Sequence, residues 1–261
     1  MAIEKEPESV IRGRISFLKV LLDIIPPDEL PDIISGQLAQ TPGNAPNVQR
    51  QNIILLSLWD LLKARRNSDY RNYILNAFMV LPISKSLVGG SYFLKRKKPV
   101  RYMPFRFFID LLGILESREY TIYLLGGNDK TLKRVENNIH QTFPRLRIVG
   151  RRSAFRKQEE GAIIEAIRKA SPHLLLVGRG IRGGEMWIAR NSAGLNRGLR
   201  LWCSDLFDVL TEKKSRPGDN VFNHGLEAFY YALRNPLKIF RVFNYIRYKF
   251  LLLFYKIFNK D

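Results

Sequence analysis

Glycines that follow two apolar runs are the residues of this chain best suited to bind a ligand. Residues 174–177 are four consecutive apolar residues that lead into a glycine-rich turn and then into Glu185. Glycine lets the backbone turn sharply and approach a ligand closely, and a helix that begins just beyond presents free N–H groups to an anion such as a phosphate. A second such turn follows residues 120–125. The glycines concerned are Gly126, Gly127, Gly178, Gly180, Gly183 and Gly184.

The spacing of these glycines leaves two interpretations open. It does not match the dinucleotide fingerprint Gly-x-Gly-x-x-Gly, and Gly-x-Gly alone is a weak signal. The turns therefore indicate either an anion site or tight strand-to-helix connections that bind nothing.

The segments around the turns predict an α/β fold. Apolar runs at 120–125, 146–149, 174–177 and 199–202 suit strands, and residues 107–115, 132–139 and 163–170 are apolar at the period of a helix. Asn128 is expected to cap the second of these helices. Strands that alternate with helices over short connections favour a parallel sheet with helices on both faces. Ligands bind such sheets beyond the carboxyl ends of the strands, so both glycine turns are expected on one rim.

Charge and apolar content restrict the partners of the protein. The 261 residues carry a formal net charge of +19, which attracts nucleic acid, an anionic membrane surface or phosphorylated substrates. The single cysteine, Cys203, excludes an intramolecular disulfide and fits a reducing compartment. The first ten residues do not resemble a secretory signal, and no uncharged apolar stretch approaches the roughly 20 residues that span a bilayer. We therefore expect a cytoplasmic protein.

We divide the chain into a proline-rich N-terminal segment (1–47), an α/β domain (48–222) and a basic C-terminal appendage (223–261). In the first part, residues 15–25 suit either a strand or a short helix. In the second, residues 52–62 and 75–82 are apolar and are expected to enter the core.

Two segments are rich in positive charge. Residues 94–106 hold six basic residues and no acid, and form either a solvated loop or an anion-facing patch. Residues 234–261 hold seven Lys or Arg residues interleaved with aromatic and aliphatic residues, which is typical of a helix that lies in the membrane interface. The alternative is that this tail packs onto its own domain or, in a homo-oligomer, onto a second copy. The cations expected to meet lipid are Arg234, Lys238, Arg241, Arg247 and Lys249.

Several segments, in this order, resemble the bacterial WecG/TagA/CpsF family of glycosyltransferases over about residues 48–241. The segment at 171–187, SPHLLLVGRGIRGGEMW, is similar to the family's strand followed by Gly-x-Gly-x-Pro-x-Gln-Glu-x-Trp. The segment at 206–217, LFDVLTEKKSRP, is similar to Phe-Asp-x-x-x-Gly-x-x-x-Arg-Ala-Pro. Further similar segments are YLLGG (123–127), FPRLRIVG (143–150) and GLEAFYYALRNPLKIFR (225–241).

The resemblance implies a Rossmann-like α/β unit that transfers an N-acetylhexosamine-type sugar from a UDP-sugar to a polyprenyl-diphosphate-linked acceptor in cell-surface polysaccharide biosynthesis. It also implies a peripheral protein at the cytoplasmic face of the membrane, and neither a cofactor nor a metal is expected. Such a transfer needs a group that takes the acceptor's proton and a site that stabilises the departing diphosphate. The candidates for donor and substrate binding are Asn52, Gly126, Gly127, Gly178, Gly180, Glu185, Asp208 and Arg216.

The positions expected to do chemistry depart from the family pattern. The family's catalytic aspartate, which follows a Leu-Pro pair, corresponds to Ile83, and isoleucine cannot accept a proton. The family's Thr-x-Asn corresponds to residues 50–52, so its threonine is Arg50 and only Asn52 is kept. In the glycine-rich turn the family's proline is Arg182, which together with Arg179 adds charge that suits a diphosphate.

Each retained residue also has a purely structural interpretation. Glu185 at a helix start interacts favourably with the helix dipole, and Asp208 with Arg216 can form an exposed ion pair worth little. Trp187 is expected in the core rather than stacked on a ligand. The three histidines lack the spacing of a zinc site, and His224 is at most a weak candidate for proton transfer.

Three functions follow from these observations. The first is a membrane-associated glycosyltransferase. The second is a catalytically inactive family member that serves as a binding or scaffold subunit of a glycan pathway, which Ile83 favours. The third is nucleic-acid binding, based on the basic residues at 94–106 and 145–157. No recognisable nucleic-acid motif accompanies these patches, so it ranks last.

Overall fold

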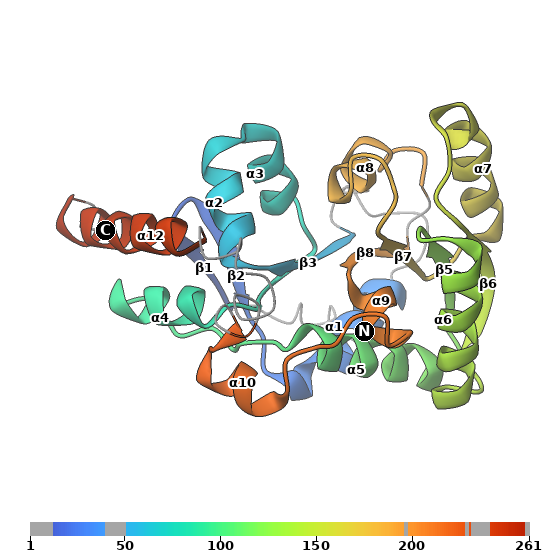
Figure 1. Cartoon of the computed structure of the whole chain (residues 1–261), viewed down its shortest axis with the longest axis horizontal. Coiled ribbons are helices and arrows are strands. Elements are labelled where there is room, and N and C mark those ends of the chain that lie inside the picture. The colour runs from blue at the N-terminus through green and yellow to red at the C-terminus, as the bar shows by residue number, and fades with distance from the viewer. Residues whose placement is uncertain (1–12, 40–50, 196–197, 228–229, 231–240, 259–261) are drawn as a thin grey trace, which may run out of the picture.

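The structure is a computed structural model that describes residues 13–39, 51–195, 198–227, 230 and 241–258 (Figure 1). Six strands form the central sheet in the spatial order β4-β3-β8-β7-β5-β6, and every adjacent pair is parallel. Their bounds are β3 (Asn52–Leu56), β4 (Met79–Pro82), β5 (Thr121–Leu125), β6 (Arg147–Arg152), β7 (Leu174–Gly178) and β8 (Leu199–Ser204). Every residue of β4, β5 and β7 is buried, as expected where helices cover both faces. The predicted α/β fold is confirmed.

Helices pack on both faces of the sheet. One face buries its apolar residues against α1 (Leu30–Ala39), α5 (Pro104–Ser117), α6 (Asp129–Thr142) and α9 (Leu206–Leu210). The other face packs against α2 (Leu58–Arg66), α3 (Ser68–Leu75), α7 (Glu160–Ala170) and α8 (Glu185–Arg190). Short helical turns, η1 (Pro27–Glu29) and η2 (Lys157–Glu159), precede α1 and α7, and α10 (Asp219–His224) follows α9 along the chain. Since α6 leaves β5 for one face and α8 leaves the neighbouring β7 for the other, the turns after these strands meet where ligands bind in such folds.

The predicted start of α6 is confirmed. Asn128 caps α6, because its side-chain oxygen accepts the Thr131 N–H at 2.8 Å, and α6 ends at Thr142, before Pro144. Ser57 caps α2 in the same way, and the Ser57 N–H donates in turn to the Asp60 carboxylate at 2.9 Å. This reciprocal pattern is a capping box.

The N-terminal segment contributes an antiparallel hairpin, β1 (Gly13–Phe17) and β2 (Val20–Ile24), so the strand alternative for residues 15–25 is correct. The buried Asp23 carboxylate accepts a bond from Arg14 Nε at 2.5 Å and from the Val80 N–H of β4 at 2.6 Å. Arg14 also donates to the Phe78 carbonyl at 2.8 Å. A buried, fully paired carboxylate thus fixes the hairpin to the edge of the central sheet.

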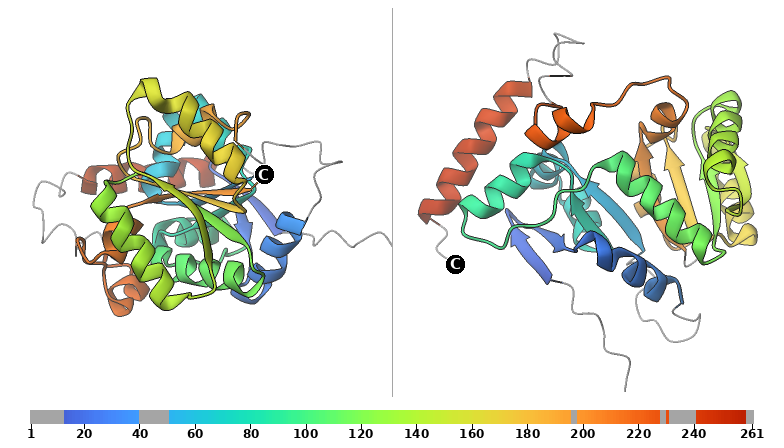
Figure 2. Two further views of the ribbon diagram at one scale, coloured as in Figure 1. Left: turned by 90° about the vertical axis from the view of Figure 1, so that its right-hand side faces the viewer. Right: turned by 90° about the horizontal axis from the view of Figure 1, so that it is seen from below.

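The C-terminal helix α12 (Arg241–Phe258) lies alongside α4 (Lys85–Phe93), as the right-hand view of Figure 2 shows. The Tyr248 hydroxyl is buried and donates to the Ser86 carbonyl at 2.6 Å. It sits directly over Gly90, where a Cβ atom would overlap it. No helix in the described part of the chain combines the length and apolar character needed to cross a bilayer.

Candidate functional site at the carboxyl rim of the sheet

The two glycine turns interlock at the carboxyl ends of β5 and β7. The Gly127 N–H donates to the Arg179 carbonyl at 2.6 Å, and the Gly127 carbonyl accepts the Ala154 N–H at 2.8 Å. Gly126 has a φ of +106°, and a Cβ atom there would lie 2.7 Å from the Gly178 carbonyl oxygen. The prediction that both turns lie on one rim is confirmed. Close packing of the two turns already requires glycine, so ligand binding by these residues stays a prediction.

Arg179 extends from the second turn towards the loop after β8. Its Nη1 lies 3.0 Å from Asp205 Oδ1 and 3.7 Å from Asp208 Oδ2, and its side chain is 63% exposed. Lys214 pairs with the same Asp205 carboxylate. The rim therefore carries two cations and two carboxylates within one partly exposed cluster. Of these residues, the sequence analysis singled out Arg179 and Asp208 for the site.

The predicted ion pair between Asp208 and Arg216 is wrong. Arg216 pairs with Asp219 at 3.4 Å, and its guanidinium lies 4.6 Å from the centre of the Phe105 ring. The chain turns at Glu212, which has a φ of +57°, and brings Lys214 back to Asp208, whose carbonyl accepts the Lys214 N–H at 3.1 Å; Arg216 lies beyond this contact. Arg216 is thus not brought together with the glycine turns by any contact among the described residues.

Glu185 begins α8 and reaches across to the helix that follows β3. Its Oε1 accepts a bond from Lys63 Nζ at 2.6 Å, and only 18% of the Glu185 side chain is exposed. Lys63 also lies 3.8 Å from the centre of the Tyr70 ring. The family residue Glu185 is therefore held between α2, α3 and α8 rather than free at a helix start.

Asp60 is a second carboxylate in this cluster. Ser57 donates to it through its N–H at 2.9 Å and its hydroxyl at 2.6 Å, and the Tyr70 hydroxyl donates at 3.1 Å. Burial raises the pKa of the Asp60 carboxyl, the hydrogen bonds from Ser57 act against this rise, and the charge of Glu185 adds to it. Burial, together with the charges of Asp60 and Glu185, also raises the pKa of Tyr70. Sequence reasoning missed Asp60, although Ser57-x-x-Asp60 just after an apolar run is a capping signature.

The end of β4 carries no carboxylate. The Ile83 N–H donates to the Leu56 carbonyl at 2.9 Å, and the Ile83 carbonyl accepts a bond from Arg101 Nε at 2.9 Å. Ser84 Oγ accepts the Leu58 N–H at 3.1 Å, so the loop after β4 is tied to the start of α2. Ile83, predicted to correspond to the family's aspartate, is therefore next to the Ser57–Asp60 turn.

Arg101 belongs to the basic segment 94–106 but does not face solvent. Its guanidinium donates to the Phe222 carbonyl of α10 at 2.5 Å and pairs with Glu227. Burial lowers the pKa of Arg101 to about 10. Lys95, Lys97 and Lys98 are exposed or partly exposed in contrast, so only part of this segment is available to an anion.

Several predicted residues do not reach the rim. Asn52 is the first residue of β3 and lies opposite Arg200 in the register, so it occupies the amino edge of the sheet. We therefore leave Asn52 out of the candidate site. Arg50, Arg234 and Lys238 lie outside the described residues, as does the side chain of Arg241. Trp187 is buried against Phe155, as predicted for a core residue.

Comparisons with known proteins identify the family of this chain. The model of the glycosyl transferase WecG/TagA/CpsF family matches residues 15–260. The chain belongs to this family. The match begins in β1 and ends beyond α12, so it is wider than the resemblance visible in the sequence. The chain is also 22% identical over 185 residues to N-acetylglucosaminyldiphosphoundecaprenol N-acetyl-beta-D-mannosaminyltransferase of Bacillus subtilis (strain 168), with 71% of this chain and 72% of that protein covered.

Among the described residues no group of three or more His, Cys, Asp or Glu side chains is arranged to hold a metal ion. His224 lies at the end of α10 and its Nδ1 is 2.8 Å from the Asn220 carbonyl oxygen. Its ring is exposed, and the Lys85 ammonium donates to its carbonyl at 3.1 Å. These contacts cap the C-terminal end of α10, and none of them joins His224 to Asp60 or Glu185.

Proposed function

We propose that this protein transfers an N-acetylhexosamine-type sugar from a UDP-sugar to a polyprenyl-diphosphate-linked acceptor, at the cytoplasmic face of the membrane, for cell-surface polysaccharide. The observation that carries the proposal is the family match over residues 15–260. The name of the Bacillus subtilis relative describes transfer of N-acetylmannosamine to an undecaprenyl-diphosphate-linked sugar, which supports the acceptor class.

We assign binding of the donor's diphosphate to the two interlocked glycine turns after β5 and β7. The turn at Gly126 and Gly127 leads directly into α6, a helix of 14 residues whose N-terminal dipole end favours an anion. Arg179 from the second turn and Lys213, which donates to Thr131 Oγ1 on the first turn of α6, add positive charge there. Cations and backbone N–H groups at this place would stabilise the charge of the leaving UDP.

We assign the role of general base, which takes the proton of the acceptor hydroxyl, to Asp60. Isoleucine at position 83 has no basic atom, whereas the Asp60 carboxylate lies one helical turn beyond Ser57, whose neighbour Leu58 contacts Ser84. In the reaction the acceptor oxygen bonds to the anomeric carbon, the bond from that carbon to UDP breaks, and the hydroxyl proton passes to Asp60. A carboxyl pKa raised by burial suits a general base, because a base works best when its pKa approaches the operating pH.

The test is transfer of labelled N-acetylmannosamine or N-acetylglucosamine from their UDP-sugars to a polyprenyl-diphosphate-linked N-acetylglucosamine in vesicles. Asp60→Asn should lower kcat by about a hundredfold or more while UDP binding, measured by calorimetry, is kept. Asp69→Asn, an exposed acid on the first turn of α3, is the matched control and should behave as wild type. Equal rates for Asp60→Asn and wild type would remove Asp60 from the mechanism.

The second candidate function is an inactive scaffold or binding subunit, which Ile83 favours. It predicts that the folded wild-type protein shows no transfer with any donor and acceptor in this assay. Saturable UDP binding without transfer would leave a binding subunit, and its partners would then be sought by pull-down.

The proposed function also includes contact of α12 with an anionic membrane. Aromatic and aliphatic side chains are exposed along this helix, and Arg247, Lys249 and Lys256 lie exposed among them. Apolar side chains that enter the interface and cations that meet anionic headgroups act together in such helices. Sedimentation with phosphatidylglycerol vesicles, and its loss at high salt, measures this contact.

A further inference from the structure

The hydrogen bonds to the Asp60 carboxylate are unevenly shared between its two oxygens. Oδ2 accepts the Ser57 N–H at 2.9 Å and the Ser57 hydroxyl at 2.6 Å. Among the described contacts, Oδ1 accepts only the Tyr70 hydroxyl, at 3.1 Å. A carboxylate oxygen can accept about two hydrogen bonds, and Asp60 is only half-buried. Oδ1 is therefore the oxygen that keeps an acceptor position for a further proton.

Tyr70 is held in place on the side of this oxygen. The residue is only 2% exposed, and its N–H donates to the side-chain oxygen of Asn67 at 2.8 Å, at the start of α3. The Lys63 ammonium lies 3.8 Å from the centre of the Tyr70 ring. Close packing of a buried ring on a capped helix start leaves the hydroxyl little room to move. The hydroxyl can therefore fix the direction of the Asp60 carboxylate.

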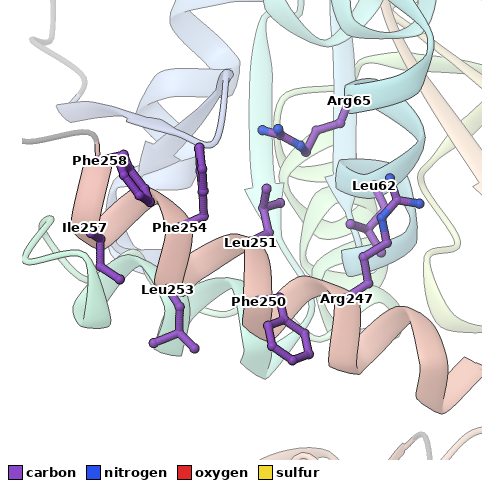
Figure 3. A pocket seen from close by; sticks show the side chains of 9 residues that line it. All are labelled: Leu62, Arg65, Arg247, Phe250, Leu251, Leu253, Phe254, Ile257 and Phe258. Atoms are coloured by element: carbon purple, nitrogen blue, oxygen red, sulfur yellow. The ribbon is translucent and has the colours of Figure 1, made fainter.

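The contacts of Asp60 lie on a different side of α2 from those that meet α12. Figure 3 shows Leu62 and Arg65 of α2 on the side that faces α12, where they line an open groove. Asp60 and Lys63 are contacted instead from α3 and α8. Residues three positions apart lie on one side of a helix, which accounts for both pairs. Removing the Tyr70 hydroxyl therefore leaves the α12 side of α2 unchanged.

Other charges surround Asp60, but they act on it without a hydrogen bond. Burial raises the pKa of the Asp60 carboxyl most and the charge of Glu185 adds to it, whereas the hydrogen bonds from Ser57 and Tyr70 lower it. The ionisable side chains of this region are Lys63 of α2, Tyr70 and Tyr73 of α3, Glu185 of α8 and Arg200 of β8. Of these, Tyr70 alone donates a hydrogen bond to Asp60 in the described structure.

We propose that Tyr70 is a positioning residue, whose hydroxyl directs Asp60 Oδ1 towards the acceptor hydroxyl. The inference rests on the proposed function for the reaction itself. In that reaction the acceptor oxygen bonds to the anomeric carbon, the bond from that carbon to UDP breaks, and the hydroxyl proton passes to Oδ1. Burial, with the charges of Asp60 and Glu185, raises the pKa of Tyr70, so its hydroxyl keeps its own proton and stays a donor.

The first experiment follows the titration of Asp60 directly, with the full chain and without substrate. Aspartate labelled with carbon-13 at its side-chain carboxyl gives NMR signals that titrate with pH, and Asp60→Asn identifies the Asp60 signal by its loss. In Tyr70→Phe this signal should titrate at a higher pH than in wild type, because the charged carboxylate loses a donor.

Tyr73→Phe is the matched control. It removes a hydroxyl from the next turn of α3, and Tyr73 makes no hydrogen bond to Asp60 in the described structure. The Asp60 signal should titrate in this variant as it does in wild type. Both substitutions keep the aromatic ring and nearly the same volume, so neither should prevent folding.

Sugar transfer gives the second readout. In Tyr70→Phe the acid limb of the kcat profile should move to higher pH, in the same direction as the Asp60 signal, and the KM for both substrates should stay as in wild type. Above this limb kcat should fall by about tenfold, since the base is present but less well aligned. A purely structural role of Tyr70 would lower stability without moving the acid limb.

Two results would overturn the proposal. An unchanged Asp60 titration in Tyr70→Phe would show that the hydroxyl does not act on the carboxylate. Equal shifts in Tyr70→Phe and Tyr73→Phe would reduce the effect to a general loosening of α3. Because the NMR titration needs no turnover, a shifted Asp60 signal without sugar transfer would keep the control of Asp60 by Tyr70 and defeat the proposed transferase. Sugar transfer with an unshifted signal would do the reverse.

Discussion

Lys63 and Glu185 are joined by a 2.6 Å hydrogen bond between the ammonium and Oε1, which ties the helix after β3 to the helix after β7. In the sheet these two strands are separated by β8, so the contact crosses the carboxyl rim. It pairs Glu185 with one cation, and the charge of Glu185 is among the causes that raise the pKa of Asp60.

Lys63→Met should move the pH dependence of sugar transfer to higher pH. Without the ammonium, the negative charge of Glu185 is uncompensated, and this raises the pKa of the Asp60 carboxyl further. Since the base must be ionised, the acid limb of the kcat profile should shift to higher pH. Lys169→Met on α7, at an exposed position, should leave the profile where it is. An unshifted profile in Lys63→Met would show that Asp60 does not limit the acid limb.

Asp60→Asn should change how stability depends on pH. Burial raises the pKa of Asp60 in the folded state, so folding is favoured by the protonated carboxyl. Its contribution is fully present below about pH 4, the usual pKa of an aspartate, and is lost as the pH rises through the higher folded value. Wild type should therefore lose stability relative to Asp60→Asn as the pH rises through this window. Urea denaturation at a series of pH values measures the difference, and parallel curves for the two proteins would contradict it.

Gly90→Ala should loosen the contact of α12 with α4. The added Cβ would overlap the Tyr248 hydroxyl and would lie 2.9 Å from the Phe17 ring. Overpacking of this kind costs about 1 to 3 kcal/mol. Gly89→Ala is the matched control, because nothing lies within 4 Å of a Cβ atom there. Thermal unfolding should separate the two variants, and Tyr248→Phe combined with Gly90→Ala should recover part of the loss. Identical melting temperatures for the two alanine variants would refute the packing seen at Gly90.

Asp23→Ala should destabilise the protein by about 3 to 5 kcal/mol, since it leaves the charge of Arg14 without its buried partner. Chemical denaturation gives the value. Asp28→Ala, an exposed acid in η1, should change stability by less than about 0.5 kcal/mol. If the two variants lost the same small amount, the hairpin would not be held to β4 through Asp23.

The sequence alone predicted those parts of the fold that depend on local patterns. Apolar runs closed by glycine marked β5 and β7, and the strand–helix alternation placed their turns on one rim. Asn128 was recognised as a cap because capping needs only residues within one turn. Strands, turns and caps depend on residues that are close together in the chain, so a local sequence pattern is enough to predict them.

The candidate site was harder to predict from the sequence, because its contacts join segments that are far apart in the chain. Lys63 and Glu185 are 122 positions apart, and no periodicity connects them. Asn52 was named as a binding residue from the resemblance alone, which does not say where β3 begins, and the structure makes Asn52 the first residue of that strand. Asp208 and Arg216 are close in sequence, yet Arg216 pairs with Asp219, and Asp208 lies 3.7 Å from Arg179 of the distant glycine turn.

Arg101 links residues 222 and 227 to the carboxyl rim of the sheet, so the C-terminal region also stabilises the rim. Its partly buried guanidinium donates to the Ile83 carbonyl at the end of β4 and to the Phe222 carbonyl of α10, and pairs with the Glu227 carboxylate. A truncation that removes everything after residue 218 would leave this partly buried cation without its carboxylate, which is destabilising. Lost activity in such a shortened protein would therefore mix damage at the rim with loss of lipid contact. Point substitutions on the exposed face of α12 separate the two effects.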